Sequence, residues 1–281
     1  MVGNYHSHCK YCDGLGEPEE FVRSAIRQGL SFYGFSSHAP LGEYSCSLMD
    51  PIHLKDYVQE IKRLKKKYNN QITLLLGLEI DFIPGVMGPH SSVFQNIELD
   101  YTIGAVHYVG FNKDGSPMSV DNSTEIFQRG LQEVFYNNYK NLFRRYFMLI
   151  RQMLQEQPPN IVAHIDKITR HNVDNIFFSE KESWYQEEID KTLSCIKKTG
   201  SVIEFNTRGL YTGKHPRPYP SISILEKIKK LGIRLMINTD AHRPDEITQG
   251  YDGALSILKD VGFKSSELLN LDFPILIKRQ S

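Results

Sequence analysis

The chain alternates short apolar runs with stretches of helical periodicity, and this alternation restricts the folds that it can adopt. Such a pattern is typical of β/α units that form a mostly parallel sheet. We predict seven strands, at residues 2–8, 32–38, 72–80, 101–109, 161–166, 202–207 and 234–240. Polar residues follow each strand, and a parallel β/α barrel builds its active face at these C-terminal strand ends.

The segments between the strands read as helices. Residues 124–155 carry apolar side chains every three or four positions, which predicts one long amphipathic helix or two. The 281 residues are expected to form a single domain over residues 1–281, because α/β barrels commonly run to about 250 residues. Other helices are expected at 18–29, 54–68, 183–199, 221–231 and 246–262, with a short one near 90–98.

Nine side chains with metal-binding groups lie at or just after the C-terminal ends of predicted strands. A His-x-His pair ends the first strand, where side chains two residues apart share a face and can reach one ion. One histidine in an apolar strand is usually a buried core residue, but recurrence at successive strand ends favours a shared site. The nine are His6, His8, Asp13, His38, Glu79, His107, His164, Asp240 and His242.

Nine donors exceed the three or four protein ligands of one catalytic zinc ion, so we expect a cluster of two or three ions. Glu79 is the expected bridging carboxylate. Mixed imidazole and carboxylate ligands suit Zn, Mn, Fe or Co, and the composition does not choose among these metals. We expect no organic cofactor.

The charge balance indicates which partners to expect. Lysine plus arginine and aspartate plus glutamate both number 33, so the formal net charge is zero. Without a basic excess we expect a small-molecule substrate and no nucleic acid. No apolar run predicts a membrane span, and the N-terminal residues do not resemble a secretory signal. We expect a cytoplasmic protein with reduced cysteines, and the sequence leaves its oligomeric state open.

The motifs together resemble the polymerase and histidinol phosphatase (PHP) family over nearly the whole chain. The blocks HSH followed by CDG, then SSHAP, GLEID, GAVHY, AHID, EFNTRG and NTDAH, stand in the family's order. The resemblance implies a distorted seven-stranded (β/α)7 barrel, similar to a TIM barrel, with three metal ions. It implies a first site of His6, His8, Glu79 and Asp240, a second of Glu79, His107 and His164, and a third of Asp13, His38 and His242.

Within this family the chain most resembles stand-alone histidinol-phosphate phosphatases, by its size, its GAVHY block and its long helical insertion. The resemblance implies a phosphoric monoester hydrolase that converts L-histidinol phosphate to L-histidinol and phosphate in histidine biosynthesis. Similar phosphatases carry arginines at the positions of Arg170 and Arg208, which we expect to bind the phosphate group. The alternative is that both arginines pair with surface carboxylates. Cys9 and Cys12 replace the Thr and Ser of many relatives, and we expect neutral thiols rather than metal ligands.

The expected reaction is attack of a metal-bound hydroxide on the phosphate monoester. We expect Asp13, Glu79, Asp240 and His242 to act in catalysis, with Asp13 or a metal-bound water near His242 protonating the leaving alkoxide. Lys214 lies in a Gly/Pro-rich loop that is long enough to cover a site. The alternatives are a nucleotide phosphatase, a phosphotyrosine phosphatase or a nuclease of the same family, or a metal-binding module without catalysis.

Overall fold

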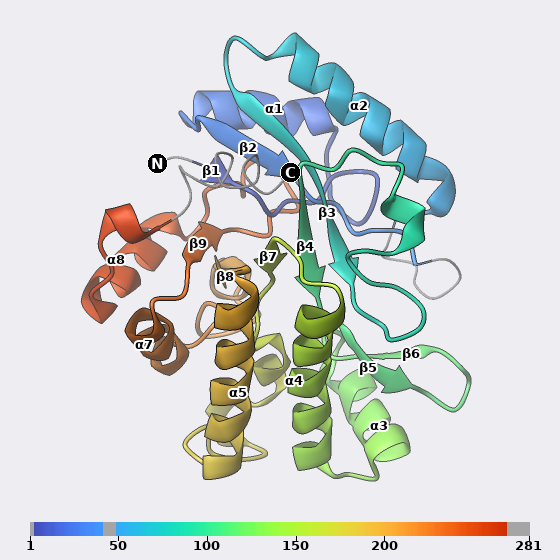
Figure 1. Ribbon diagram of the computed structural model, residues 1–281, viewed down its shortest axis with the longest axis vertical. Helices are drawn as coiled ribbons and strands as arrows, with labels where there is room; N and C mark the ends of the chain where they lie inside the picture. Colours follow the sequence, from blue (N-terminus) through green and yellow to red (C-terminus); the bar gives the residue numbers. More distant parts are fainter. Residues whose placement is uncertain (1–2, 42–48, 269–281) are drawn as a thin grey trace.

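Seven parallel strands form the main sheet of the protein (Figure 1). The computed structural model describes residues 3–41 and 49–268. Outside this description lie the first residue of the predicted strand 2–8, Cys46 and the two ends of the expected domain 1–281. The strands lie in the order β1-β2-β3-β4-β7-β8-β9, and every neighbouring pair is parallel, as predicted. They are β1 (Gly3–Asn4), β2 (Phe32–Phe35), β3 (Thr73–Asp81), β4 (Tyr101–Ala105), β7 (Ile161–Val162), β8 (Val202–Asn206) and β9 (Leu235–Asn238).

The sheet curves until its first and last strands meet, and they are joined by side chains and by a short backbone bridge beyond the strands rather than by a regular ladder. The Asn4 side chain donates to Thr239 Oγ1 at 2.9 Å, and the Tyr5 amide donates to Asn238 Oδ1 at 2.9 Å. Beyond the strands, the His8 amide donates to the Ala241 carbonyl at 2.7 Å. This seam between β1 and β9 makes the barrel distorted, as expected. Several candidate ligands lie at the C-terminal end of the seam.

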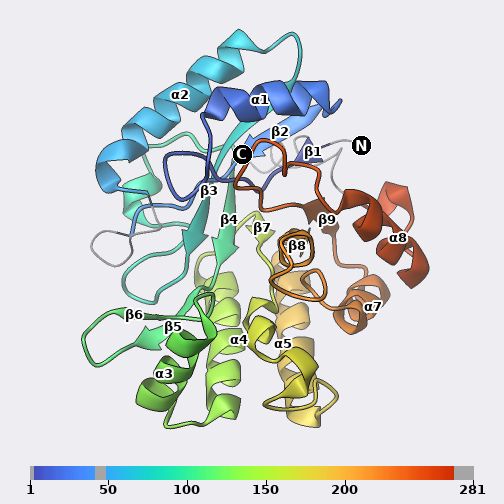
Figure 2. The same ribbon diagram turned by 180° about the vertical axis from the view of Figure 1, so that it is seen from behind.

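Helices cover the outside of the sheet (Figures 1 and 2). Each of the longer predicted helices is present, although the last one begins later than predicted. The helices are α1 (Pro18–Arg27), α2 (Leu54–Lys67), α3 (Thr124–Phe135), α4 (Tyr139–Glu156), α5 (Ser183–Thr199), α6 (Arg208–Tyr211), α7 (Ile222–Leu231) and α8 (Tyr251–Val261). Among the described helices, none is long and apolar enough to cross a membrane.

The amphipathic stretch at 124–155 forms two helices, α3 and α4, rather than one. Tyr136 and Asn137 between them adopt positive φ angles of 52° and 61°, which end α3 because an α-helix cannot continue through left-handed residues. The Asn138 side chain then accepts a hydrogen bond from the Asn141 amide and caps α4. Helical periodicity is the same in both halves, so only the local backbone conformation separates them.

The predicted strand 101–109 is shorter in the structure. β4 ends at Ala105, and β5 (Tyr108–Phe111) leaves the sheet to pair antiparallel with β6 (Pro117–Ser119). At this break the His107 amide donates to the Asp81 carboxylate at 3.1 Å rather than to a backbone carbonyl. The Asp114-Gly115 pair in the connecting turn is a sequence signal for a hairpin, which the predicted strand 101–109 did not include. The short helix expected near 90–98 is a single 3-10 turn, Ser92–Phe94.

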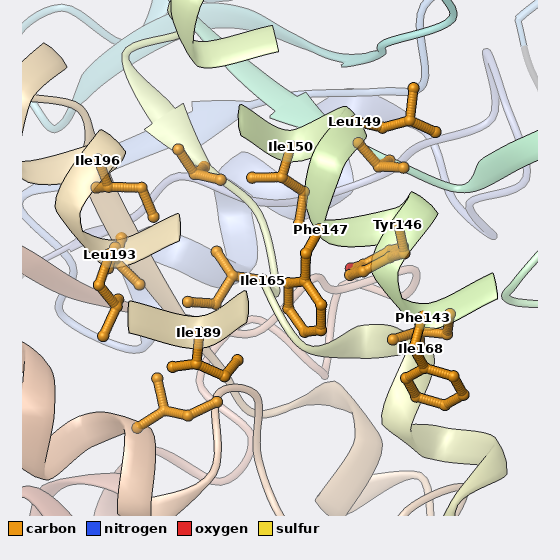
Figure 3. Close-up of a cluster of buried hydrophobic side chains, with 14 of the residues drawn as sticks. Phe143, Tyr146, Phe147, Leu149, Ile150, Ile165, Ile168, Ile189, Leu193 and Ile196 are labelled. Carbon is orange, nitrogen blue, oxygen red and sulfur yellow. The ribbon is translucent and has the colours of Figure 1, made fainter. Parts of the chain in front are cut away.

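Two apolar layers support the strands. Outside the barrel, aromatic and aliphatic side chains of α4 and α5 interdigitate, among them Phe143, Phe147, Ile189 and Leu193 (Figure 3). The aromatic stripe of α4 is therefore core, as helical periodicity predicts. A second cluster is built from strand residues and their neighbours and centres on Tyr101. The two layers hold the strand ends in fixed positions, and those ends carry the candidate ligands.

Candidate metal centre

All nine predicted metal-binding side chains converge at the C-terminal end of the barrel. They arrive from different strands: for example, Glu79 lies within β3, whereas His38 and His107 follow β2 and β4. The ring of His8 lies 4.3 Å from that of His38 and 4.2 Å from that of His242, measured between ring centres. Parallel strands bring these residues together because all their C-terminal ends point to the same side.

Glu79 stands at the centre of this cluster and is buried. Its Oε2 lies 3.2 Å from His6 Nε2, 3.4 Å from His8 Nε2 and 3.1 Å from His38 Nδ1. Its Oε1 lies 3.2 Å from His164 Nε2 and 3.8 Å from His107 Nε2. One carboxylate therefore faces five imidazoles, which is the arrangement that a bridging ligand requires.

Two aspartates complete the cluster on the side of the β1–β9 seam. Asp240 Oδ1 lies 3.3 Å from His8 Nε2, 3.8 Å from His6 Nε2 and 3.6 Å from His242 Nδ1. Asp13 Oδ1 lies 3.3 Å from His242 Nε2, and 3.9 Å from both His8 and His38. The Asp13 side chain is 36% exposed, whereas that of Asp240 is buried. Asp13 is therefore the aspartate ligand candidate most open to solvent.

Hydrogen bonds to the far side of three rings determine which nitrogen faces the centre. His6 Nδ1 lies 2.6 Å from Glu204 Oε1, His107 Nδ1 lies 3.0 Å from Asp81 Oδ1, and His242 Nδ1 lies 3.0 Å from the Asp240 carbonyl oxygen. An oxygen acceptor at Nδ1 requires the proton there, so in the neutral ring Nε2 keeps its lone pair. Such outer partners are typical of metal-binding histidines.

The inward-facing atoms fit metal ions. In the neutral rings, Nε2 of His6 and of His8 faces oxygens of Glu79 and Asp240, so acceptor faces acceptor unless a proton or a cation lies between them. Nε2 of His6 and His8, and Nδ1 of His38 and His164, are buried without a hydrogen-bond partner among the described residues. A divalent cation satisfies both kinds of acceptor, and imidazole with carboxylate is the ligand set of Zn, Mn, Fe and Co.

The electrostatics of the cluster favour positive charge. Burial would lower the pKa of His6, but the charges of Glu204, Glu79 and Asp240 outweigh it and hold that pKa well above the usual value. Burial would raise the pKa of Glu79 and of Asp240, yet the surrounding cationic groups keep both well below their usual range. Burial lowers the pKa of His8, and the neighbouring His242 and His38 lower it further. The carboxylates stay ionised and His8 stays neutral, which are the protonation states that ligands need, whereas His6 has to release its proton when an ion binds.

The donor atoms fall into three groups whose members lie within 4.8 Å of one another. These groups overlap, because His8 and His38 each belong to two of them, and they differ from the predicted sites, in which Glu79 is the shared residue. His164 belongs to none of the three, although its Nε2 lies 3.2 Å from Glu79. The assignment of ligands to individual ions stays a prediction. The groups are His8, Asp13, His38 and His242; His6, His8 and Asp240; and His38, Glu79 and His107.

A pocket of about 580 Å³ opens over the cluster, and both predicted arginines line it. Arg170 Nη1 donates to the backbone oxygen of Asp121 at 2.8 Å and to its carboxylate. Arg208 Nη1 donates to the Asp240 carbonyl at 2.9 Å and lies 3.3 Å from Glu246 Oε2. Each arginine thus borders the pocket, as phosphate binding requires, and also pairs with a carboxylate, which was the alternative role. Lys214 lines the same pocket.

Sequence reasoning missed several residues that support or line the site. Asp81 and Glu204 hold candidate ligands and stand in the GLEID and EFNTRG blocks; Asp81 lies two residues after Glu79, so the strand alternation could have placed it on the same face. Lys167 directly follows the AHID block and lines the pocket. Asp121 also lines it, and nothing in its local sequence signals this position.

The two cysteines near the site are free thiols. Cys12 Sγ lies 3.5 Å from His8 Nδ1, and Cys9 Sγ lies 3.2 Å from Ser37 Oγ. Burial raises the pKa of Cys9 to about 11 and raises that of Cys12 further. Protonated thiols are poor metal ligands, so the structure favours the expected role of neutral neighbours.

Comparisons with known proteins agree with this geometry. The chain is 29% identical to "Probable histidinol-phosphatase" of Schizosaccharomyces pombe, over 92% of this chain and 87% of that protein. It is 26% identical to "Histidinol-phosphatase" of Bacillus subtilis, over 89% and 97%. The fold matches the crystal structure of histidinol phosphate phosphatase from Lactococcus lactis in complex with zinc, L-histidinol and phosphate. The TM-score is 0.70, and the sequences are 21% identical over 94% of this chain and 95% of that chain. The family described as "PHP domain" matches residues 4–208. This chain therefore belongs to the PHP family.

Proposed function

We propose that the protein is a metal-dependent phosphatase that hydrolyses L-histidinol phosphate to L-histidinol and phosphate, a reaction of histidine biosynthesis. The observation that carries the proposal is the position of Glu79, which lies among the nine donors beneath a pocket lined by Arg170 and Arg208. The names of the relatives in yeast and bacteria, and the ligands of the Lactococcus structure, support the choice of substrate.

In the hydrolysis of a phosphate ester, different side chains have the tasks of binding metal ions, binding the phosphate group and transferring a proton. Two or three divalent or transition-metal ions (Zn, Mn, Fe or Co), when bound, supply Lewis acidity and lower the pKa of the attacking water. The nine candidate ligands would hold these ions beneath the pocket. Arg170 and Arg208 offer N–H groups that bind phosphate oxygens and orient the ester. We assign catalysis to Asp13, Glu79, Asp240 and His242. Asp13 or a metal-bound water near His242 is the candidate source of the proton for the leaving alkoxide. Burial would raise the pKa of Asp13, but His242, His38 and His8 hold it well below its usual value, which favours the water.

We also propose that residues 1–281 form one domain and that the enzyme works in the cytoplasm. The apolar clusters around the strands draw on elements from most of the described chain, which supports a single unit. Cys9, Cys12 and Cys195 are free thiols, and reduced cysteines are typical of a reducing compartment.

A substrate panel tests the proposed function. The metal-loaded protein is expected to release phosphate from L-histidinol phosphate with a kcat/KM about a hundredfold above that for a nucleoside monophosphate or phosphotyrosine. A preference for either of the latter would replace the proposed substrate with another activity of the family. Metal-loaded protein that releases phosphate from none of them would be a binding module.

Two variants test the assigned roles. Arg208→Met is expected to lower kcat/KM by about tenfold to a hundredfold while metal content stays near that of the wild type, because a charged hydrogen bond to phosphate is lost. Glu79→Gln is expected to lose metal as well. Arg23→Met, which changes an exposed arginine on α1, is the matched control. Full kcat/KM in Arg208→Met would refute its role as a phosphate ligand.

A further inference from the structure

Lys167 is a buried lysine in the wall of the pocket. It begins the 3-10 segment Lys167–His171, and only 8% of the residue is exposed. Its backbone amide donates to the His164 carbonyl at 2.8 Å, so its position is tied to a candidate metal ligand. Lysine is rarely buried unless its ammonium group has a partner.

The ammonium group lies between two carboxylates. Lys167 Nζ is 3.0 Å from Asp121 Oδ2 and 3.8 Å from Asp240 Oδ2. The other oxygen of Asp121 accepts from Arg170, so one carboxylate holds two cations side by side. The single negative charge of Asp121 is shared between these two cations, and the next carboxylate, that of Asp240, lies farther from Lys167.

Asp240 attracts the Lys167 ammonium but does not take up its hydrogen-bond donors. The 3.8 Å separation from Lys167 exceeds hydrogen-bond length, and Asn206 donates to the same Asp240 oxygen at 3.2 Å. An ammonium has three donors, of which Asp121 takes one. In Arg170 both hydrogen bonds to Asp121 use Nη1. Donors of both residues are therefore left for an anion in the pocket.

We propose that Lys167 is a further phosphate-binding residue, whose ammonium contacts a nonbridging phosphate oxygen beside Asp240 and acts together with Arg170. The inference rests on the proposed phosphatase function. Lys167 lies next to the candidate metal ligands, so it neutralises charge on the phosphate at the reacting centre rather than at the pocket rim. Asp121 keeps the ammonium in place when no substrate is bound.

Binding of inorganic phosphate to the metal-loaded protein, measured by isothermal titration calorimetry, tests this role without any turnover. Lys167→Met is expected to bind phosphate about tenfold to a hundredfold more weakly than the wild type, the loss typical of a hydrogen bond to a charged group. Lys167→Arg keeps the charge and is expected to recover part of the affinity. Lys191→Met, on the exposed face of α5, is the matched control and is expected to bind as the wild type does.

Metal content and thermal melting of the same variants separate a phosphate contact from a structural role. Lys167→Met is expected to keep its metal and to melt cooperatively, since Asp121 stays paired with Arg170. Wild-type phosphate affinity in Lys167→Met, or a loss of metal that accounts for the weaker binding, would overturn the inference. If the wild type does not hydrolyse L-histidinol phosphate but phosphate binding depends on Lys167, the inference stands and the proposed substrate fails.

Discussion

At the scale of single residues, the protonation of the candidate ligands depends on the polar groups that surround them, such as Glu204 and Asp81. Glu204 is the clearest case, because its fully buried carboxylate accepts hydrogen bonds from four groups. His6 Nδ1 and the Asn238 side chain bind Oε1 at 2.6 and 3.2 Å, and the His164 amide and the Asn206 side chain bind Oε2 at 3.1 and 2.9 Å. Glu204 thus orients two candidate ligands.

The variant Glu204→Gln is expected to bind metal about tenfold to a hundredfold more weakly, since the outer partner of a ligating histidine is altered. The new amide cannot accept at both positions, so the two buried donors that face its nitrogen also lose their acceptor. Competition with a chelator measures the metal affinity. Glu226→Gln, at an exposed position on α7, is the control. Unchanged metal affinity in Glu204→Gln would show that its carboxylate does not orient His6.

At the scale of secondary-structure elements, a large side chain on one strand fills the space that glycines leave on two others. The buried Tyr101 ring of β4 occupies space left by Gly34 in β2 and Gly77 in β3. Its hydroxyl donates to the Tyr5 carbonyl at 2.6 Å and lies 3.1 Å from the Phe35 carbonyl. One side chain therefore links strand β2, strand β4 and the segment that follows β1.

Gly77→Ala is expected to destabilise the protein by about 1–3 kcal/mol, because overpacking of a fixed core has a cost of this size. A Cβ atom at Gly77 would lie 2.5 Å from Cζ of Tyr101, a ring atom that cannot move without breaking the two hydroxyl contacts. Urea unfolding measures the free-energy change. Gly253→Ala in α8 is the control, since its Cβ would meet nothing within 4 Å. Equal stability of the two variants would contradict the tight packing of Tyr101.

At the scale of the whole molecule, the candidate metal centre lies at the seam where the barrel closes. His6 and His8 follow β1, and Asp240 and His242 follow β9, so ions bound between them would connect the two ends of the sheet. The backbone bond from His8 to Ala241 spans the same seam. Carboxylates crowded at this place repel one another when no cation lies between them.

Metal removal is therefore expected to loosen the seam more than the rest of the molecule. Chelation should lower the melting temperature, because an ion that binds only the folded state stabilises it by mass action. Hydrogen exchange should quicken most at the amides of His8 and Ala241, whereas α4 amides such as that of Ile150 should change little. Glu79→Gln, expected to lack metal, should not respond to the chelator. Equally faster hydrogen exchange over the whole chain would contradict the idea that bound ions hold the two sides of the seam together.

Much of the fold and of the site could be predicted from the sequence by itself. The alternation of apolar runs and helical stretches is a local property, and it determined the seven parallel strands and the helices between them. The residue types at strand ends are also local, so they marked all nine side chains that the structure brings together. Parallel topology then made convergence necessary, because it places every C-terminal strand end on one side.

Only the tertiary structure decided how charges and hydrogen bonds are shared in the site. His6 and Glu204 are 198 positions apart, and Arg170 and Asp121 are 49 apart, so no local pattern pairs them. At the break after Ala105, the His107 amide likewise binds the side chain of Asp81, which lies on a neighbouring strand. Such contacts depend on side-chain geometry between distant segments, which residue type and periodicity do not specify. For this reason Lys167, a residue without a motif, becomes a candidate phosphate ligand only in the folded protein.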